Sequence, residues 1–167
     1  MRLNLFSLAL SGMLLLPAVA QADTFNFSSV GSGGGFSGSG VLTATDNGNG
    51  SFSITGITGT GVTGLIGVND FFGNDNLLFP NASRLVDVNG FAFTAALGGD
   101  LFSVNIFSTL TGYEAVTMDS DGNFDDTPVT FTVSKGTALT PEPASLVMMG
   151  SGLMAMAAAG YRKARSN

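Results

Sequence analysis

Oxygen-bearing side chains cluster in one acidic segment of the chain, residues 119–126. They stand there at alternate positions: Asp119, Asp121, Asn123 and Asp125. This spacing matches the first half of a calcium-binding loop, but Phe124 replaces the glycine and Thr130 the bidentate glutamate that such a loop needs. Two interpretations stay open. The four residues form a weak calcium site, or the segment is a hairpin loop in which Asp121-Gly122 forms the turn.

A second candidate site combines aromatic and amide side chains within residues 71–76. Its candidate ligand-binding residues are Phe71, Phe72, Asn74 and Asp75. Aromatic rings offer an apolar face to a sugar ring, while amide and carboxylate oxygens accept hydrogen bonds from hydroxyl groups. The alternative interpretation is a long loop whose phenylalanine side chains pack inward.

The composition leaves few groups for catalysis. The 167 residues include no histidine, cysteine or tryptophan, so the commonest general base and the thiolate nucleophile are missing. A hydrolase would need paired carboxylates, and the densest acids, Glu114 and residues 119–126, fall in a predicted strand and a predicted turn. We expect a protein that is not an enzyme, with no catalytic residues and no cofactor other than weak calcium. A carboxylate-based glycan hydrolase is the less favoured alternative.

Hydrophobic and polar residues alternate with a period of two across the middle of the chain. Residues 129–134 show the pattern, because Val, Phe and Val alternate with Thr, Thr and Ser. Such alternation indicates strands with one buried and one solvated face, and clusters of Gly, Asn and Asp between the runs favour turns. We therefore expect ten strands: 24–29, 36–45, 51–57, 61–68, 77–79, 84–88, 91–96, 101–109, 113–118 and 129–134.

These strands fall within residues 23–140, a length typical of one domain. Short strands at nearly regular spacing predict an all-β fold, an antiparallel β-sandwich or a jelly-roll-like domain. Thirteen of the fourteen phenylalanines lie in this segment and should fill its core. Its two basic and eleven acidic residues give a formal charge of −9. This charge excludes nucleic acid as an expected partner, because nucleic-acid binding needs cationic patches.

The N-terminal residues 1–22 have the pattern of a secretory signal peptide. Arg2 supplies the positive start, residues 3–16 supply a helical apolar region, and Pro17 ends that helix. Ala20 and Ala22 then form a small-x-small cleavage site before residue 23. The sequence therefore predicts an exported protein.

The C-terminal residues 141–167 combine three features in a fixed order. Pro141-Glu142-Pro143 comes first, and its prolines favour an extended, exposed backbone. The uncharged run 144–161 follows and is long enough for a transmembrane helix. The tail 162–167 then carries the cations expected to stop the span on the cytoplasmic side: Arg162, Lys163 and Arg165.

This order of tripeptide, span and basic tail resembles the PEP-CTERM sorting signal of Gram-negative bacteria that produce exopolysaccharide. The resemblance covers residues 141–167 and implies export by the secretion machinery, transient insertion into the inner membrane and processing by an exosortase near Pro141-Glu142-Pro143. The product would then reach the cell surface or the extracellular matrix. We expect a structural or adhesive component of an exopolysaccharide biofilm matrix, with a carbohydrate- or calcium-binding module as the alternative.

Overall fold

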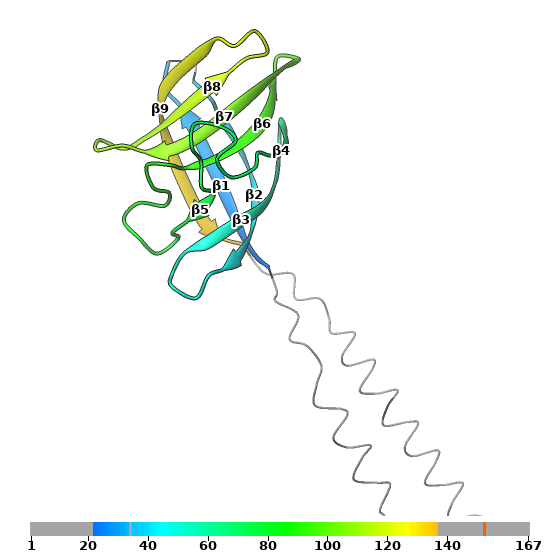
Figure 1. Ribbon diagram of the computed structural model, residues 1–167, viewed down its shortest axis with the longest axis vertical. Helices are drawn as coiled ribbons and strands as arrows, with labels where there is room; N and C mark the ends of the chain where they lie inside the picture. The colour runs from blue at the N-terminus through cyan, green and yellow to red at the C-terminus, as the bar shows by residue number, and fades with distance from the viewer. Residues whose placement is uncertain (1–21, 34, 137–151, 153–167) are drawn as a thin grey trace, which may run out of the picture. The chain divides into compact units, whose positions relative to one another are not determined.

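A computed structural model describes residues 22–33, 35–136 and 152 of the chain. Nine strands lie in this part (Figure 1). Their bounds are β1 Asp23–Gly31, β2 Gly38–Asp46, β3 Phe52–Gly59, β4 Val62–Leu65, β5 Leu77–Leu78, β6 Phe91–Leu97, β7 Asp100–Ser108, β8 Tyr113–Met118 and β9 Phe124–Lys135. No helix among the described residues has the length and apolar character needed to cross a membrane. The predicted signal-peptide helix and membrane span lie outside the described residues, except at Ala22 and Gly152.

The nine strands form one sheet in the order β4-β6-β7-β8-β9-β1-β2-β3-β5, and every paired strand is antiparallel. The predicted all-β, antiparallel class is confirmed. The strands do not divide into two separate sheets, as a β-sandwich would require. The sheet is continuous because β1 pairs with β9 along one edge and with β2 along the other. It thereby joins strands β4 and β6–β9 to strands β2, β3 and β5.

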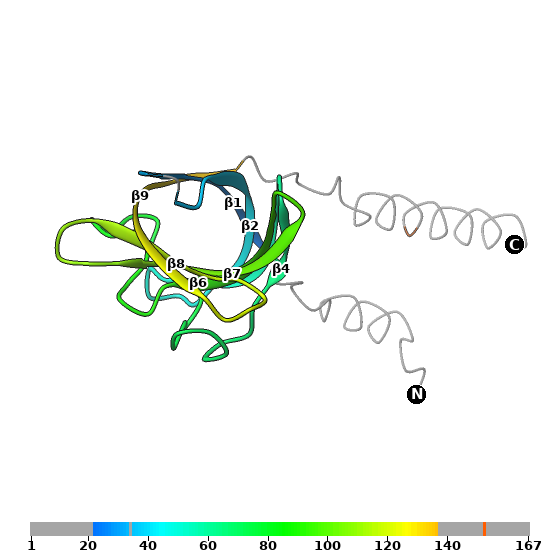
Figure 2. The same ribbon diagram turned by 90° about the horizontal axis from the view of Figure 1, so that it is seen from above.

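The single sheet curls round so that β1 and β2 face β6, β7 and β8 (Figure 2). The short β3–β4 connection requires this curl, because these consecutive strands stand near opposite ends of the strand order. Register shifts between Thr43 and Ala44 and between Val62 and Gly64 help the strands to bend. The two halves of the curled sheet therefore pack against each other as the layers of a sandwich would.

The structure differs from the predicted local structure in two segments, residues 84–88 and residues 119–126. Residues 84–88 were predicted to be a strand, but they form an irregular segment around the buried Val86. Isolated bonds hold this segment: the Leu85 N–H donates to the Tyr113 hydroxyl at 2.8 Å, and the Ser108 N–H donates to the Asp87 carbonyl at 2.7 Å. The predicted turn 119–126 is shorter, because β9 begins at Phe124.

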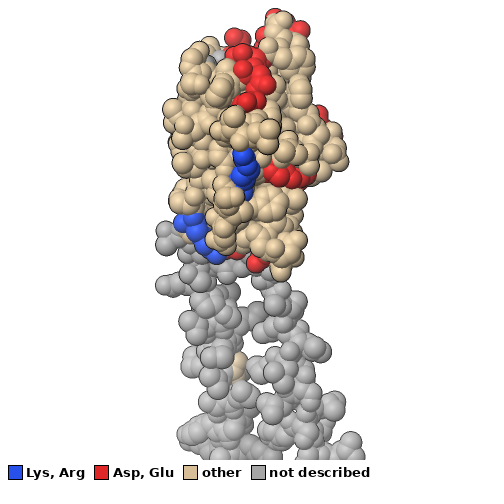
Figure 3. All heavy atoms as spheres, turned by 90° about the vertical axis from the view of Figure 1, so that its left-hand side faces the viewer, with Lys and Arg blue, Asp and Glu red and all other residues tan. Residues whose placement is uncertain are grey.

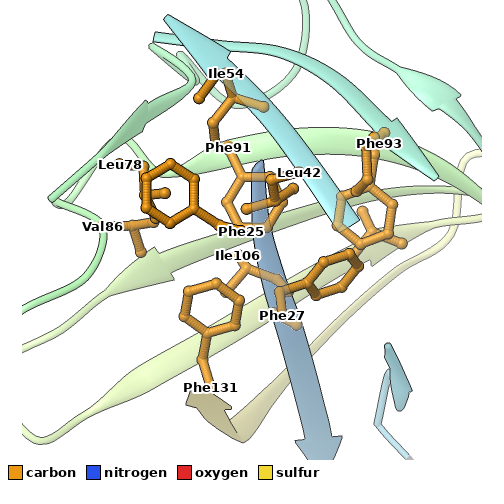
Figure 4. Close-up of a cluster of buried hydrophobic side chains, with 14 of the residues drawn as sticks. Phe25, Phe27, Leu42, Ile54, Leu78, Val86, Phe91, Phe93, Ile106 and Phe131 are labelled. Atoms are coloured by element: carbon orange, nitrogen blue, oxygen red, sulfur yellow. The ribbon is translucent and has the colours of Figure 1, made fainter. Parts of the chain in front are cut away.

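The main core fills the inside of the curled sheet, and phenylalanine dominates it (Figure 4). Phe91 and Phe93 of β6 are stacked, with ring centroids 5.5 Å apart. Phe27 of β1 reaches them across the core at 6.3 and 6.4 Å. Phe36, in the β1–β2 connection, packs edge-on against Phe93 at 5.2 Å. These contacts join the opposite walls of the sheet. The predicted phenylalanine core is thus present, but it does not take up all thirteen rings, because Phe72 and Phe124 are exposed.

A second, smaller core lies on the outer face of the same sheet. It contains Phe71, Ala92 and Val116, with partly buried apolar neighbours from the loop and from β7 and β8: Ile66, Phe107 and Met118. Side chains of a strand alternate between its two faces, so Ala92 points away from the main core that Phe91 and Phe93 enter. The loop 66–76 therefore covers the outer face of β6, β7 and β8.

Candidate ligand-binding surface

Two buried asparagines hold the loop 66–76 on the sheet. Asn74 accepts a hydrogen bond from the Phe71 N–H at 3.0 Å and donates to the Gly67 carbonyl at 2.9 Å. Asn76 donates to the Ile66 carbonyl at 2.8 Å and accepts from the N–H of Ala92 in β6 at 3.0 Å. A further bond of 2.8 Å joins the two side chains. Together they satisfy backbone groups that the sheet ladder does not reach.

The structure separates the four residues 71, 72, 74 and 75 that the sequence proposed as one ligand-binding set. Phe71 lies in the outer core and Asn74 is fully buried, so both belong to the packing of the loop. Phe72 is 57% exposed, and Asp75 is partly buried beside Asn89. Phe72 is therefore the one residue of the four whose side chain is mostly exposed, and ligand binding by this set stays a prediction.

Phe72 forms an exposed aromatic pair with Phe124, the first residue of β9. Their ring centroids lie 5.2 Å apart with an interplanar angle of 84°, and Phe124 is 58% exposed. Phe71 supports Phe72 from beneath, with centroids 4.9 Å apart at 80°. Three rings thus run from the outer core to the surface in successive edge-to-face contacts. We call Phe72 and Phe124 the aromatic pair.

The backbone at Phe72 has φ +54°, a left-handed conformation that bulky residues rarely adopt. Gly73 follows at φ +69°. Glycine or asparagine would take this conformation at lower cost. The chain therefore keeps a large apolar ring at a strained, exposed position.

Sequence reasoning missed Phe124 as part of this surface. It treated the residue only as an interruption of the acidic segment. The signal that could have found it is the alternation of β9: Val129 and Phe131 face the main core, so Phe124 faces outward with the even-numbered residues. Its contact with Phe72 depends on the path of the loop 66–76, which periodicity does not specify.

Asp75 shares its environment with a second carboxylate, Asp87. Burial raises the pKa of Asp75 above its ordinary value, and the nearby Asp87 charge raises it further, while hydrogen bonds from Asn89 and the Leu77 N–H act in the opposite direction. Asp87 accepts from the N–H groups of Asn89 and Gly90 at 2.9 and 3.1 Å. Both carboxylates therefore cap turns at the edge of the loop 66–76.

Gly90 is required at this turn, because it has φ +70° and a Cβ there would collide with the Ile106 carbonyl oxygen. Its own carbonyl accepts from the N–H groups of Asp75 and Asn76 at 3.2 and 3.0 Å. The buried Asn105 of β7 completes the junction by donating to the Asn89 carbonyl at 3.0 Å. Asp75 and Asp87 thus lie in a turn whose backbone groups are held by several hydrogen bonds.

Asp119 organises the acidic hairpin between β8 and β9. Its Oδ1 accepts from the N–H groups of Asp121 and Asn123, each at 2.9 Å, and its Oδ2 accepts from the Asn123 side chain at 2.8 Å. These bonds, with that from Asn123 first, lower the pKa of Asp119 although the side chain is exposed. Asp125 lies in β9 opposite Thr117. The hairpin interpretation accounts for this geometry.

No group of three or more His, Cys, Asp or Glu side chains with metal-binding geometry occurs in the part of the chain that the structure describes. Calcium binding by Asp119, Asp121, Asn123 and Asp125 stays a prediction. Any calcium held there would compete for Asp119 oxygens that already accept hydrogen bonds within the loop.

The two basic residues of segment 22–136 both have structural partners. Arg84 donates to the carbonyls of Leu110 and Gly112 at 3.0 and 3.1 Å and so closes the β7–β8 turn. Lys135 lies 3.1 Å from Asp23 and pairs the ends of β9 and β1. Acidic side chains gather in separate groups on one face of the domain, and most of that face is uncharged (Figure 3). The domain surface thus combines neutral polar regions with local acidic groups.

The fold and surface define a small all-β domain with an exposed aromatic pair. Comparison with known protein families adds the sorting signal: residues 139–163 match the PEP-CTERM protein-sorting motif. The suspected resemblance is confirmed, and the chain carries the signal of an exported exosortase substrate with a transient membrane anchor. No curated protein and no solved structure matches the chain.

The matched range contains Pro141-Glu142-Pro143 and, apart from Gly152, lies outside the described residues, as does the basic tail with Arg162, Lys163 and Arg165. The roles of these residues stay predictions, as does signal cleavage before Asp23 at the site formed by Ala20 and Ala22.

Proposed function

We propose that the mature domain is a non-catalytic structural or adhesive component of the cell surface or of an exopolysaccharide matrix. The observation that carries this proposal is the PEP-CTERM motif on a domain in which several charged side chains hold turns and strand ends, namely Arg84, Asp87, Asp119 and Lys135. An exosortase delivers the domain, and the domain then acts through its surface.

The outer face of β9, β1 and β2 supports a role in contact with hydrated polymer. Thr132, Ser28 and Ser39 are register partners on these three adjacent strands, and Asn26 pairs with Ser134. These side chains point away from the phenylalanine core. They offer hydroxyl and amide groups, which exchange hydrogen bonds with a polyhydroxylated matrix without adding charge.

A glycan hydrolase is the alternative that one observation favours. Asp75 and Asp87 lie close enough for one carboxylate to raise the pKa of the other, as in sites where acids perform proton transfer. Against this reading, both carboxylates are engaged by N–H groups of the turn. We therefore assign them to the fold.

The proposed role is tested in the producing bacterium by deleting the protein and measuring cell attachment and matrix cohesion. We expect a loss of attachment that the wild-type chain restores. Asp75→Asn/Asp87→Asn should restore it equally, because the amide side chains still accept hydrogen bonds from the turn. Unchanged attachment after deletion would contradict an adhesive role.

A hydrolase would give the opposite pattern in the same strains. The Asp75→Asn/Asp87→Asn protein would reach the surface in normal amounts yet fail to restore the phenotype. Loss of soluble glycan fragments in that strain would identify the missing activity. The two outcomes separate a surface role from a catalytic one.

A further inference from the structure

We propose that the aromatic pair, Phe72 and Phe124, binds a neutral saccharide. The inference rests on the proposed surface role and assigns it a site and a ligand class. The two rings are nearly perpendicular, at 84°, and each is more than half exposed. They form an apolar corner that can take the face of one sugar ring against one phenyl ring and its edge against the other.

The strain at Phe72 supports a role in binding. The ring is held outward at φ +54°, while Phe71 beside it is buried and anchors the loop. Strained backbone that presents an exposed side chain is concentrated at ligand-binding positions. Packing alone would be served as well by a residue that adopts this conformation without strain.

One polar acceptor, Asp126, accompanies the pair on the same face. Asp126 follows Phe124 by two residues in β9, so it lies on the same side of the strand about 7 Å further along. It is exposed, and its carboxylate can accept hydrogen bonds from sugar hydroxyl groups. An apolar corner beside a carboxylate matches the mixed surface of a pyranose ring.

Charge selects a neutral ligand. The predicted mature segment carries a formal charge of −9, and the hairpin that presents Phe124 contains Asp119, Asp121, Asp125 and Asp126. Anionic glycans, nucleic acids and anionic lipid surfaces would be repelled by this hairpin.

A second copy of the chain is also a poor occupant. A two-fold contact through the aromatic pair places the same surface patch of both copies face to face. It would bring the acidic hairpins of the two molecules together, without basic residues from the described segment to offset them, because Arg84 and Lys135 are engaged elsewhere. The neutral saccharide avoids this repulsion.

The chain contains no tryptophan, so a single introduced tryptophan reports on one position. We would purify full-length Phe72→Trp protein in lipid nanodiscs and titrate it with dextran, cellohexaose and alginate while recording tryptophan emission. Leu110→Trp is the matched control, because Leu110 is 99% exposed in the β7–β8 turn. We expect at least one neutral glycan to shift the emission of Phe72→Trp and not that of Leu110→Trp.

Loss of the second ring should weaken this binding. We expect Phe72→Trp/Phe124→Ala to bind the same glycan roughly tenfold more weakly, as truncation of a central aromatic contact does. In the wild-type protein, saturation-transfer NMR should show contact between aromatic protons and the glycan. The Phe72→Asn substitution should abolish this contact. Phe72→Asn suits the left-handed backbone, so the protein should remain folded.

Three results would overturn the proposal: no response to either neutral glycan, a response equal in Leu110→Trp, or equal binding of the anionic alginate. Concentration-dependent self-association that Phe72→Asn removes, without glycan binding, would also overturn it and identify a second copy as the occupant. The deletion phenotype remains a separate measurement. Attachment that depends on the protein but not on Phe72 would reject this site and leave the surface role standing.

Discussion

At the scale of single residues, Asn and Asp side chains determine the loops of this domain. They accept backbone N–H groups within turns, as Asp119 and Asp87 do, or bridge a loop to the sheet, as Asn76 does. Short polar side chains can replace ladder hydrogen bonds where the chain leaves a strand. Three of the polar residues proposed as sites, Asn74, Asp75 and Asp119, therefore also hold the backbone of their loops.

Asp119 should make the hairpin sensitive to acid. Its pKa is lowered in the folded protein, so its stabilisation is present above the ordinary carboxyl pKa of about 3.9 and is lost as pH falls through the lower folded value. We expect wild type to exceed Asp119→Asn in urea midpoint at pH 6, with the difference shrinking below about pH 4.

Asp121→Asn is the control for this measurement, because Asp121 contributes its backbone N–H to the loop. Its urea midpoint should follow that of wild type at both pH values. A difference between wild type and Asp119→Asn that does not change with pH would contradict the assigned charge effect.

Asn76→Gly should destabilise the protein by about 2–3 kcal/mol, because it leaves the Ile66 carbonyl and the Ala92 N–H buried without their partner. Glycine accommodates the left-handed φ of +57°, so the loss reports the side chain. Asn69→Gly is the matched control, because Asn69 has a similar φ of +65° but an exposed side chain. Thermal unfolding of the full chain should separate the two, and equal melting temperatures would refute the role of the Asn76 amide.

At the scale of elements, the loop 66–76 and the sorting signal have separate roles, one in the packing of the domain and one in its sorting. The loop seals the outer face of the sheet and presents Phe72 next to β9. The sorting motif at residues 139–163 directs export and processing. Surface contacts of the domain and its delivery can therefore be altered independently.

Replacing Pro141-Glu142-Pro143 by three alanines should leave the precursor uncut and retained in the membrane fraction. Alanine removes the fixed φ of the two prolines and the charge that marks the tripeptide. Fractionation and mass spectrometry of the C-terminus measure both effects. Pro80→Ala, a proline outside the motif, is the control and should be processed normally. Unchanged release of the triple-alanine chain would show that the tripeptide is not needed.

At the scale of the whole molecule, stability depends on phenylalanines that meet across the curled sheet. β1 and β6 are not paired in the sheet, yet Phe27 contacts both Phe91 and Phe93. These contacts close the inside of the sheet and exclude water from it. The interior is therefore sensitive to loss of ring volume at one position.

Phe93→Ala should lower the free energy of unfolding by about 3–5 kcal/mol, because Phe93 is fully buried and its loss leaves a cavity among three neighbouring rings. Phe124→Ala removes the same side chain from an exposed position and should cost less than about 1 kcal/mol. Urea unfolding of both variants tests the assignment. Similar losses would mean that the core is not located where these contacts place it.

Features carried by contiguous residues could be predicted from the sequence alone. A period of two predicted the strand 129–134, which lies within β9, because alternation between faces is a property of one strand alone. The sorting signal was readable for the same reason, since its tripeptide, span and basic tail are contiguous.

Features that depend on contacts between distant segments could not be predicted in this way. The same six residues, 71–76, place Phe71 in the outer core and Phe72 at the surface, and no local pattern distinguishes these two rings. Phe124 joined the candidate site only when β9 and the loop 66–76 came together. The single sheet likewise depends on pairing of β1 with β9. Strand partners are selected by packing and register across the whole chain, whereas periodicity records only which face of each strand is buried.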